Sequence, residues 1–187
     1  MLFPLPEYSA FVWISGFTEK PKDLDTLVRA IQDKYPDVSV QFVDMNKVPG
    51  SRYLFLATLN ALKSFSSKPV SKSLSMEILL YIGANRQISE AIRLVGISPN
   101  SEKVSAVVVG RTKEETSGAA ELLSKIVGQE GSDKLVDTWS SDRVRNVRAI
   151  FEIGSKELKA TLRSDETRTQ AIERLAIERS ALLTIRK

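Results

Sequence analysis

The sequence predicts an α/β (α+β) fold in which helices pack on a small mixed β-sheet of about four strands. One observation is that short β-branched or aromatic runs are separated by longer segments whose apolar residues recur every three or four positions. Strands and helices that alternate in this way pack as layers. A second observation is that no repeat, low-complexity run or linker divides the 187 residues. A single domain spanning residues 1–187 is therefore expected.

Four segments have the residue pattern of strands. Tyr8–Gly16 mixes aromatic and β-branched residues and is the expected first strand, and Val38–Asp44 alternates apolar and polar positions. Val104–Val109 is mostly valine and is the strongest strand pattern in the chain. Lys134–Trp139 is the shorter candidate for a fourth strand.

The helices are predicted from apolar spacing and from residues that start or stop a helix. Ser73 can cap one helix, Thr112 and Glu115 form a capping box for another, and Gly128 can stop that second helix. The stretch 154–163 is ambiguous. The expected helical segments are Thr18–Lys34, Arg52–Phe65, Ser73–Ile82, a short helix capped by Asn85 with Ile88, Ala91, Ile92 and Val95 on one face, Thr112–Val127, one around Val144–Phe151, and Asp165–Ile185.

The composition excludes several kinds of chemistry. Cysteine and histidine are both absent, so disulfides, Cys- or His-ligated metal centres and histidine-dependent nucleophilic relays cannot be built. No glycine-rich phosphate-binding motif occurs, and no apolar stretch approaches the ~20 residues that cross a bilayer. We therefore expect no metal, no cofactor and no membrane partner, and we expect a cytoplasmic protein.

No catalytic residue is assigned, because the acidic residues are explained by helix chemistry. Pairs such as Asp23/Asp25 lie at helix starts, where negative charge is stabilising. Glu77 differs because it lies within an apolar run, and we expect it to pair with Arg86 or Lys72. An enzyme that uses Glu77 or Lys72 in a small-molecule pocket stays open as an alternative.

The segment that follows Val70 resembles a known family. It contains S-x-S-L-x-M-E-I-L-L-Y from Ser71, and then R-Q-I-S-E-A-I-x-x-x-G-I from Arg86 to Ile97. This pattern resembles the small kinase-binding subunit of the KEOPS complex, the TPRKB-like family. The resemblance continues more weakly through Val144–Ile153 and the C-terminal sequence AIERLAIERSALLTIRK. The elbow sequence Arg86-Gln87-Ile88 is closer to archaeal members of that family.

The resemblance implies a non-catalytic role. Members of the family bind and stimulate the atypical kinase/ATPase subunit of KEOPS, and through it they join the other subunits. The complex makes threonylcarbamoyl-adenosine in tRNA, and archaeal members also hold the single-stranded CCA end of the tRNA. A stand-alone RNA-binding module without a kinase partner is the alternative function.

Two basic segments suggest where such partners would bind. Residues 60–99 carry five basic and two acidic residues, and residues 140–187 carry eleven and seven. The alternative to a polyanion contact is that both basic segments are solvated helix faces. We assign tRNA to the first segment, through Lys63, Lys68, Lys72, Arg86, Gln87 and Arg93.

The kinase is assigned to the C-terminal helix. A helix that docks on another protein needs an exposed apolar stripe with a charged rim. The expected interface residues are Ile172, Leu175, Ala176 and Leu182, with Arg179 on the rim. The alternative is that this stripe packs within its own chain.

Overall fold

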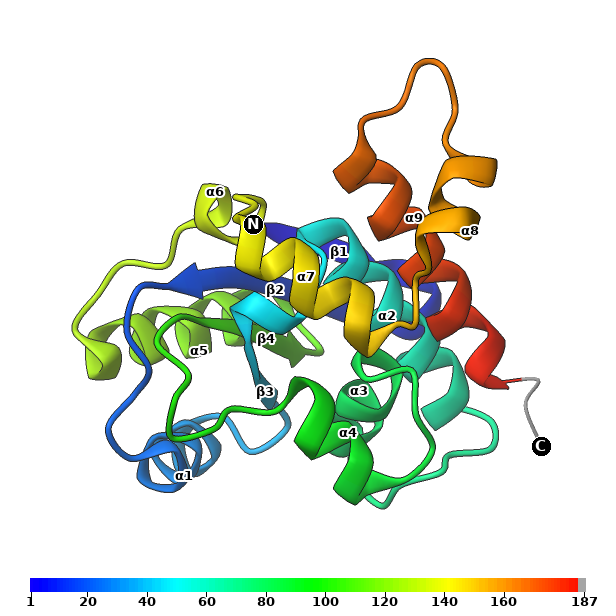
Figure 1. Ribbon diagram of the computed structural model, residues 1–187. Helices are drawn as coiled ribbons and strands as arrows, with labels where there is room; N and C mark the ends of the chain where they lie inside the picture. The colour runs from blue at the N-terminus through cyan, green and yellow to red at the C-terminus, as the bar shows by residue number, and fades with distance from the viewer. Residues whose placement is uncertain (185–187) are drawn as a thin grey trace. The chain divides into compact units, whose positions relative to one another are not determined.

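The computed structural model describes residues 1–184, and the chain divides into two compact units, each made of two stretches of sequence (Figure 1). The first unit comprises Met1–Met45 and Ile97–Val136. The second comprises Asn46–Gly96 and Asp137–Lys187, of which residues 185–187 lie outside the described part. The expectation of a single domain over residues 1–187 stays a prediction.

The first unit contains a four-stranded sheet in the order β1-β2-β4-β3. The strands are β1 (Leu2–Leu5), β2 (Ala10–Phe17), β3 (Ser39–Asp44) and β4 (Val104–Gly110). All three strand pairs are antiparallel. The α/β (α+β) class is confirmed, and the four-stranded sheet is antiparallel throughout instead of mixed.

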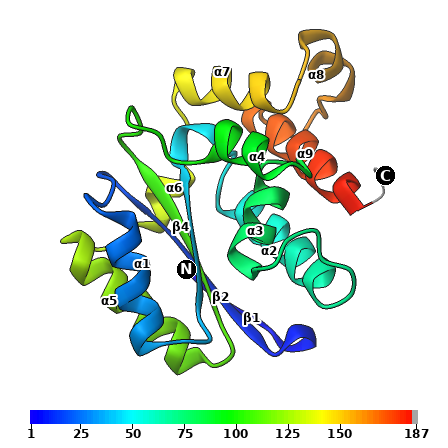
Figure 2. The ribbon, with the colours of Figure 1, turned by 90° about the horizontal axis from the view of Figure 1, so that it is seen from below.

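Two helices pack together on one side of this sheet, α1 (Leu24–Lys34) and α5 (Lys113–Val127) (Figure 2). Their apolar faces meet the strands in one buried cluster, which is why both sequences alternate apolar and polar residues with helical spacing. Its members are Phe17, Leu27, Ile31, Val38, Val40, Phe42, Val104, Ala106, Val108, Ala119 and Leu123.

The fourth strand lies at the N-terminal end of the sequence, so the strand expected at Lys134–Trp139 is wrong. β1 and β2 form a hairpin across a short 3-10 turn (Pro6–Tyr8), and Ser9 closes that turn with a φ of 47°. β1 tolerates Pro4 because it is an edge strand. Residues Asp133–Val136 form the single helical turn α6, and Val136 is buried.

The second unit is helical. α2 packs against α3 and α9, and α3 also packs against α4. Buried hydroxyls join these helices: Tyr53 donates to the Ile82 carbonyl at 2.7 Å, and Ser180 donates to the Tyr81 carbonyl at 2.8 Å. The helices are α2 (Ser51–Phe65), α3 (Leu74–Ile82), α4 (Ile88–Val95), α7 (Ser141–Ile150), α8 (Ser155–Thr161) and α9 (Arg168–Ala181), with a 3-10 turn over Leu182–Thr184.

Most of the expected helix ends are confirmed. The Ser73 and Thr112 side chains accept hydrogen bonds from the backbone N–H groups three residues ahead, and Gly128 ends α5 with a φ of 76°. The expected capping box at Thr112 is only half formed, because the buried Oε2 of Glu115 has no hydrogen-bond partner among the described residues. Asn85 is not the cap of α4. Its side-chain oxygen accepts from Gln87 N at 2.9 Å, so it closes a turn before the helix, and Gln87 takes the cap position.

The expected helix over Asp165–Ile185 is shorter and starts later. Thr167 and Gln170 form a reciprocal capping box, which fixes Arg168 as the first residue of α9. The ambiguous stretch before it contains α8. Ile185, the last residue of the expected helix, lies outside the described residues. Within residues 1–184, none of the helices combines the length and the apolar character needed to cross a membrane.

Candidate binding surfaces

The apolar stripe of α9 is part of the core of the helical unit. Ile172, Leu175 and Ala176 are buried, and α9 packs against α2, α3, α7 and α8. These three residues therefore do not form the exposed surface that was expected of them. Leu182 is different, because 44% of it is exposed just after the end of α9.

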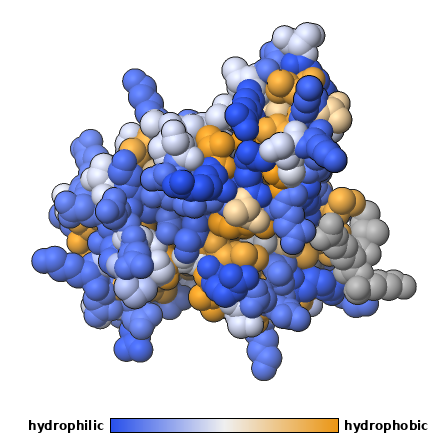
Figure 3. Space-filling view, in the orientation of Figure 1, coloured by the Kyte–Doolittle hydropathy of each residue, from blue (hydrophilic) through white to orange (hydrophobic). Residues whose placement is uncertain are grey.

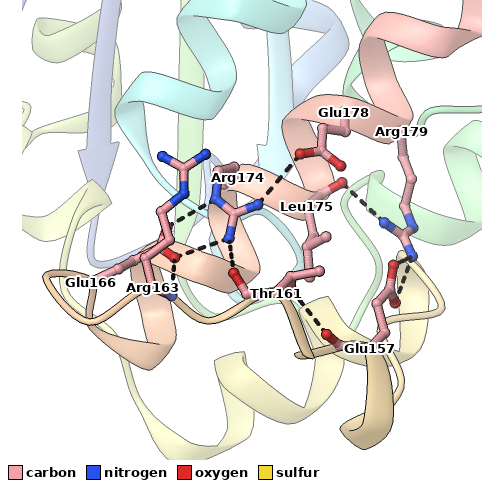
Figure 4. A network of polar contacts seen from close by, with 8 residues as sticks. All are labelled: Glu157, Thr161, Arg163, Glu166, Arg174, Leu175, Glu178 and Arg179. Atoms are coloured by element: carbon pink, nitrogen blue, oxygen red, sulfur yellow. Dashed lines mark hydrogen bonds and ion pairs between the residues drawn. The ribbon is translucent and has the colours of Figure 1, made fainter. Parts of the chain in front are cut away.

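The Arg179 side chain forms its hydrogen bonds within the same unit. Its guanidinium donates to both carboxylate oxygens of Glu157 at 2.8 and 2.9 Å and to the Leu175 carbonyl at 3.2 Å (Figure 4). Beside this pair, Arg174 donates to the two carboxylate oxygens of Glu166, each at 3.0 Å. The hydrogen bond from Arg174 lowers the pKa of the Glu166 carboxyl. Both arginines thus fasten α9 to the α8 region.

An exposed apolar pair lies on α4. Ala91 and Val95 are buried, whereas Ile88 and Ile92 are 42% and 47% exposed, one helical turn apart. The four residues were expected on one face, and only half of that face is covered. In the space-filling view the visible face of the protein is mainly hydrophilic, with small hydrophobic patches among the polar side chains (Figure 3). An exposed i,i+4 isoleucine pair is therefore a distinctive surface feature.

A groove of about 510 Å³ lies beside α4 and is lined by the elbow after α3, the end of α7 and one residue of α9. It brings together Arg93 and Arg179, one residue from each predicted site. Arg93 is paired with Glu90, at 3.0 Å from Nε and 2.7 Å from Nη2. Two lining residues, Ala84 and Glu152, have left-handed backbones with φ of 47° and 52°. Such conformations are uncommon outside glycine and often mark functional turns.

The six residues expected to bind tRNA form two groups. Lys63, Lys68 and Lys72 are exposed at the end of α2 and in the loop that follows it. Arg86, Gln87 and Arg93 are also exposed, but they follow the far end of α3. A nine-residue helix is about 14 Å long. The structure therefore does not gather the six into one compact site.

Glu77 has a different environment from the one expected. Its side chain is fully buried, and its carboxylate accepts hydrogen bonds from Val70 N at 3.1 Å and from Ser71 N at 2.8 Å. It binds these two loop amides instead of Lys72 or Arg86. Sequence reasoning missed this because the partners are backbone groups, which have no signature in the sequence.

A second buried polar cluster surrounds the start of α2. The Asp137 carboxylate accepts from the backbone N and the hydroxyl of Ser51, both at 2.8 Å, and so caps the helix from a distant part of the sequence. Burial raises the pKa of Glu173, and the Asp137 charge acts in the same direction. No sequence motif signalled this arrangement.

Arg143 completes this cluster as a buried cation. It donates to the Val48 carbonyl at 2.8 Å and to the Thr138 carbonyl at 2.7 Å, and its guanidinium lies 5.3 Å from the centre of the Trp139 ring. Burial lowers its pKa to about 10. Within residues 1–184, no group of three or more acidic side chains is placed to hold a metal ion. The hydrogen bonds of Asp137 and Arg143 join the start of α2 to the segment before α7.

Comparison with known proteins identifies the family. The sequence model of the kinase binding protein CGI-121 family matches residues 19–184. The chain belongs to the CGI-121 family. A curated relative of this CGI-121 protein is the EKC/KEOPS complex subunit CGI121 of Yarrowia lipolytica (strain CLIB 122 / E 150). The two are 24% identical over 106 residues, which cover 56% of this chain and 62% of the relative. The resemblance to the family, based on residues 71–97, is thereby confirmed, and its archaeal type stays a prediction.

Proposed function

We propose that this CGI-121 protein is a non-catalytic, cytoplasmic subunit of a KEOPS complex. There it binds and stimulates the atypical kinase/ATPase subunit and helps to recruit tRNA for threonylcarbamoyl-adenosine synthesis. The observation that carries the proposal is the family match, which extends over residues 19–184 and so covers parts of both compact units. The tRNA part rests in addition on the exposed basic side chains described above.

We place the kinase contact on α4 and Leu182. Docking helices contribute exposed apolar anchors, and Ile88, Ile92 and Leu182 are each more than 40% exposed. The positively charged Arg86 lies just before α4 and would supply the rim. The buried part of the α9 stripe supports this surface from within the unit and does not touch the partner.

The kinase proposal is tested by co-purification with the kinase subunit. We expect Ile92→Glu to lower the recovery of the complex at least tenfold, because the charge would be desolvated in the interface. Ile126→Glu is the matched control, since Ile126 is 45% exposed on α5 of the other unit. Equal recovery of the two variants would contradict the α4 surface. Failure of the wild-type protein to bind the kinase at all would favour the stand-alone RNA-binding module.

The RNA contact is proposed at Lys63, Lys68 and Lys72. Within residues 1–184 none of these ammonium groups is paired with a carboxylate. Residues 60–76 contain no acid, and the next acid along the chain is the buried Glu77. Unpaired cations of this kind suit the phosphates of a single strand. We expect removal of the CCA end from tRNA to weaken binding to the wild-type protein. A Lys68→Ala/Lys72→Ala variant should respond much less to that removal.

We propose no enzymatic activity for the alternative centre at Glu77. A catalytic carboxylate must reach its substrate, whereas that of Glu77 is fully buried and already accepts two hydrogen bonds. Assays of the purified chain with ATP and with nucleosides should show no turnover above that of a Glu77→Gln variant.

A further inference from the structure

The Glu77 carboxylate is unusual because it is fully buried. A buried charge is costly unless hydrogen bonds or an opposite charge compensate it. The position near the start of α3 favours a negative side chain, and the two loop amides supply the hydrogen bonds. An apolar residue here would extend the apolar run of α3 without this cost. The carboxylate therefore has a task that an apolar side chain could not perform.

That task concerns the loop between α2 and α3. At its first end, Lys68 N donates to the Ser64 carbonyl at 2.8 Å, and at its second end Ser73 caps α3. Between these two ends, the N–H groups of Val70 and Ser71 donate to Glu77. Lys68 and Lys72 flank this clamped pair and are exposed. The buried carboxylate thus fixes the backbone from which both lysines project.

We propose that Glu77 is a positioning residue that holds Lys68 and Lys72 in place for the phosphates of a single-stranded nucleic acid. The inference rests on the proposed RNA contact and adds a residue that never touches the RNA. A loop that is already ordered loses less conformational entropy when the ligand binds. Glu77 therefore contributes to affinity through the two lysines.

The geometry shows why glutamine would be a poor replacement. Val70 N lies within hydrogen-bond distance of both carboxylate oxygens, at 3.3 and 3.1 Å, and Ser71 N lies 2.8 Å from one of them. A carboxylate has only acceptors, whereas an amide has one acceptor and an NH₂ donor. In a Glu77→Gln variant the amide oxygen at the Oε2 position can still accept from Ser71 and Val70, but both bonds lose the negative charge that strengthens them. The NH₂ group replaces the second acceptor and faces the Val70 N–H from 3.3 Å.

The test combines Glu77→Gln with Lys68→Ala/Lys72→Ala in a double-mutant cycle. The probe is a short single-stranded RNA that ends in CCA, and its affinity is measured by fluorescence anisotropy. We expect Glu77→Gln to weaken binding by about threefold to tenfold, and to have no further effect when both lysines are already absent. Hydrogen exchange at Val70 and Ser71 should accelerate in the same variant.

Ser180→Ala is the control for a general loss of stability. It removes another buried hydrogen bond of the helical unit, from Ser180 to the Tyr81 carbonyl. We expect it to lower the melting temperature and to leave RNA affinity unchanged. If Glu77→Gln does not fold, Glu77→Asp keeps the charge and withdraws the acceptors by one methylene. It should then show the same dependence on the lysines.

Three results would overturn the inference, and the last of them would also contradict the proposed RNA contact. If the losses from Glu77→Gln and from the lysine variant multiply, Glu77 acts independently of the lysines and is not a positioning residue. Unchanged hydrogen exchange at Val70 and Ser71 would show that the hydrogen bonds to Glu77 do not order the loop. This result would also overturn the inference. If Lys68→Ala/Lys72→Ala binds RNA like the wild type, the proposed RNA contact is wrong, and the inference fails with it.

Discussion

The guanidinium of Arg179 donates to both carboxylate oxygens of Glu157, and this pair ties α9 to α8 (Figure 4). Two parallel hydrogen bonds give an Arg–carboxylate pair a fixed geometry. The charge of Arg179, which the sequence analysis placed on the rim of a kinase interface, is therefore compensated inside the helical unit. The first prediction follows from this pair.

Arg179→Ala and Glu157→Ala should each destabilise the protein, and the double variant should cost less than their sum. Partial exposure limits the coupling to about 0.5–1 kcal/mol, which urea denaturation of the four proteins can measure. High salt should reduce the coupling. Strict additivity would mean that the pair contributes nothing to the free energy of unfolding.

A second prediction separates the buried from the exposed part of the expected α9 interface. Leu175 is 2% exposed, so Leu175→Glu should lower the free energy of unfolding by more than about 3 kcal/mol. Leu182→Glu should change it by less than about 0.5 kcal/mol, because Leu182 already contacts water. Chemical denaturation checks both variants. A folded and stable Leu175→Glu protein would contradict the buried position.

These residues show what the sequence could and could not predict. The spacing of Ile172, Leu175 and Ala176 correctly indicated an amphipathic helix, as the valine run indicated β4. The spacing gives the period of a stripe, but it does not tell whether the stripe packs against its own chain or a partner. The same pattern on α4 is half buried and half exposed, at Ala91 and at Ile92 respectively.

Long-range polar contacts were the other limit of prediction. Local caps such as Ser73 and Thr112 were predicted because both partners lie within one turn. Asp137 caps α2 across 86 positions, and Glu77 binds loop amides that carry no side-chain signature. Only the fold brings such groups together. The elbow groove, which places Arg93 near Arg179, belongs to the same class.

A third prediction concerns the pH dependence of stability. Burial raises the folded-state pKa of Glu173 above its usual value of 4.5. The protonated carboxyl is thus favoured in the folded state, and this stabilising contribution is fully present below the unfolded pKa and lost as pH rises through the folded pKa. Glu173→Gln keeps an acceptor but cannot ionise.

The stability of the Glu173→Gln variant should therefore increase relative to the wild type as the pH rises from about 4 towards 7. Urea denaturation of both proteins at several pH values measures the difference. Other carboxyls titrate in both proteins and cancel in the comparison. A difference that does not change with pH would show that burial has not shifted the ionisation of Glu173.

A fourth prediction uses two exposed glycines as a matched pair. Gly128 and Gly154 both have open space where a Cβ would lie, but only Gly128 has a positive φ, of 76°. Gly128→Ala should cost about 1 kcal/mol through backbone strain alone. Gly154→Ala should change stability by less than about 0.5 kcal/mol. Thermal denaturation compares them, and equal melting temperatures would contradict the left-handed cap of α5.

The last prediction distinguishes the two basic groups at opposite ends of α3. Each lysine that neutralises a phosphate of a single strand should contribute about 0.7 unit to the slope of log K against log salt. Lys68→Ala and Lys72→Ala should each reduce that slope. Arg93→Ala should reduce the slope much less, because the Arg93 guanidinium is already paired with Glu90. The same hydrogen bond lowers the pKa of the Glu90 carboxyl. Titrations of single-stranded RNA at several salt concentrations measure the three slopes. A larger change for Arg93→Ala than for the lysine variants would move the RNA contact from the α2–α3 loop to the elbow groove.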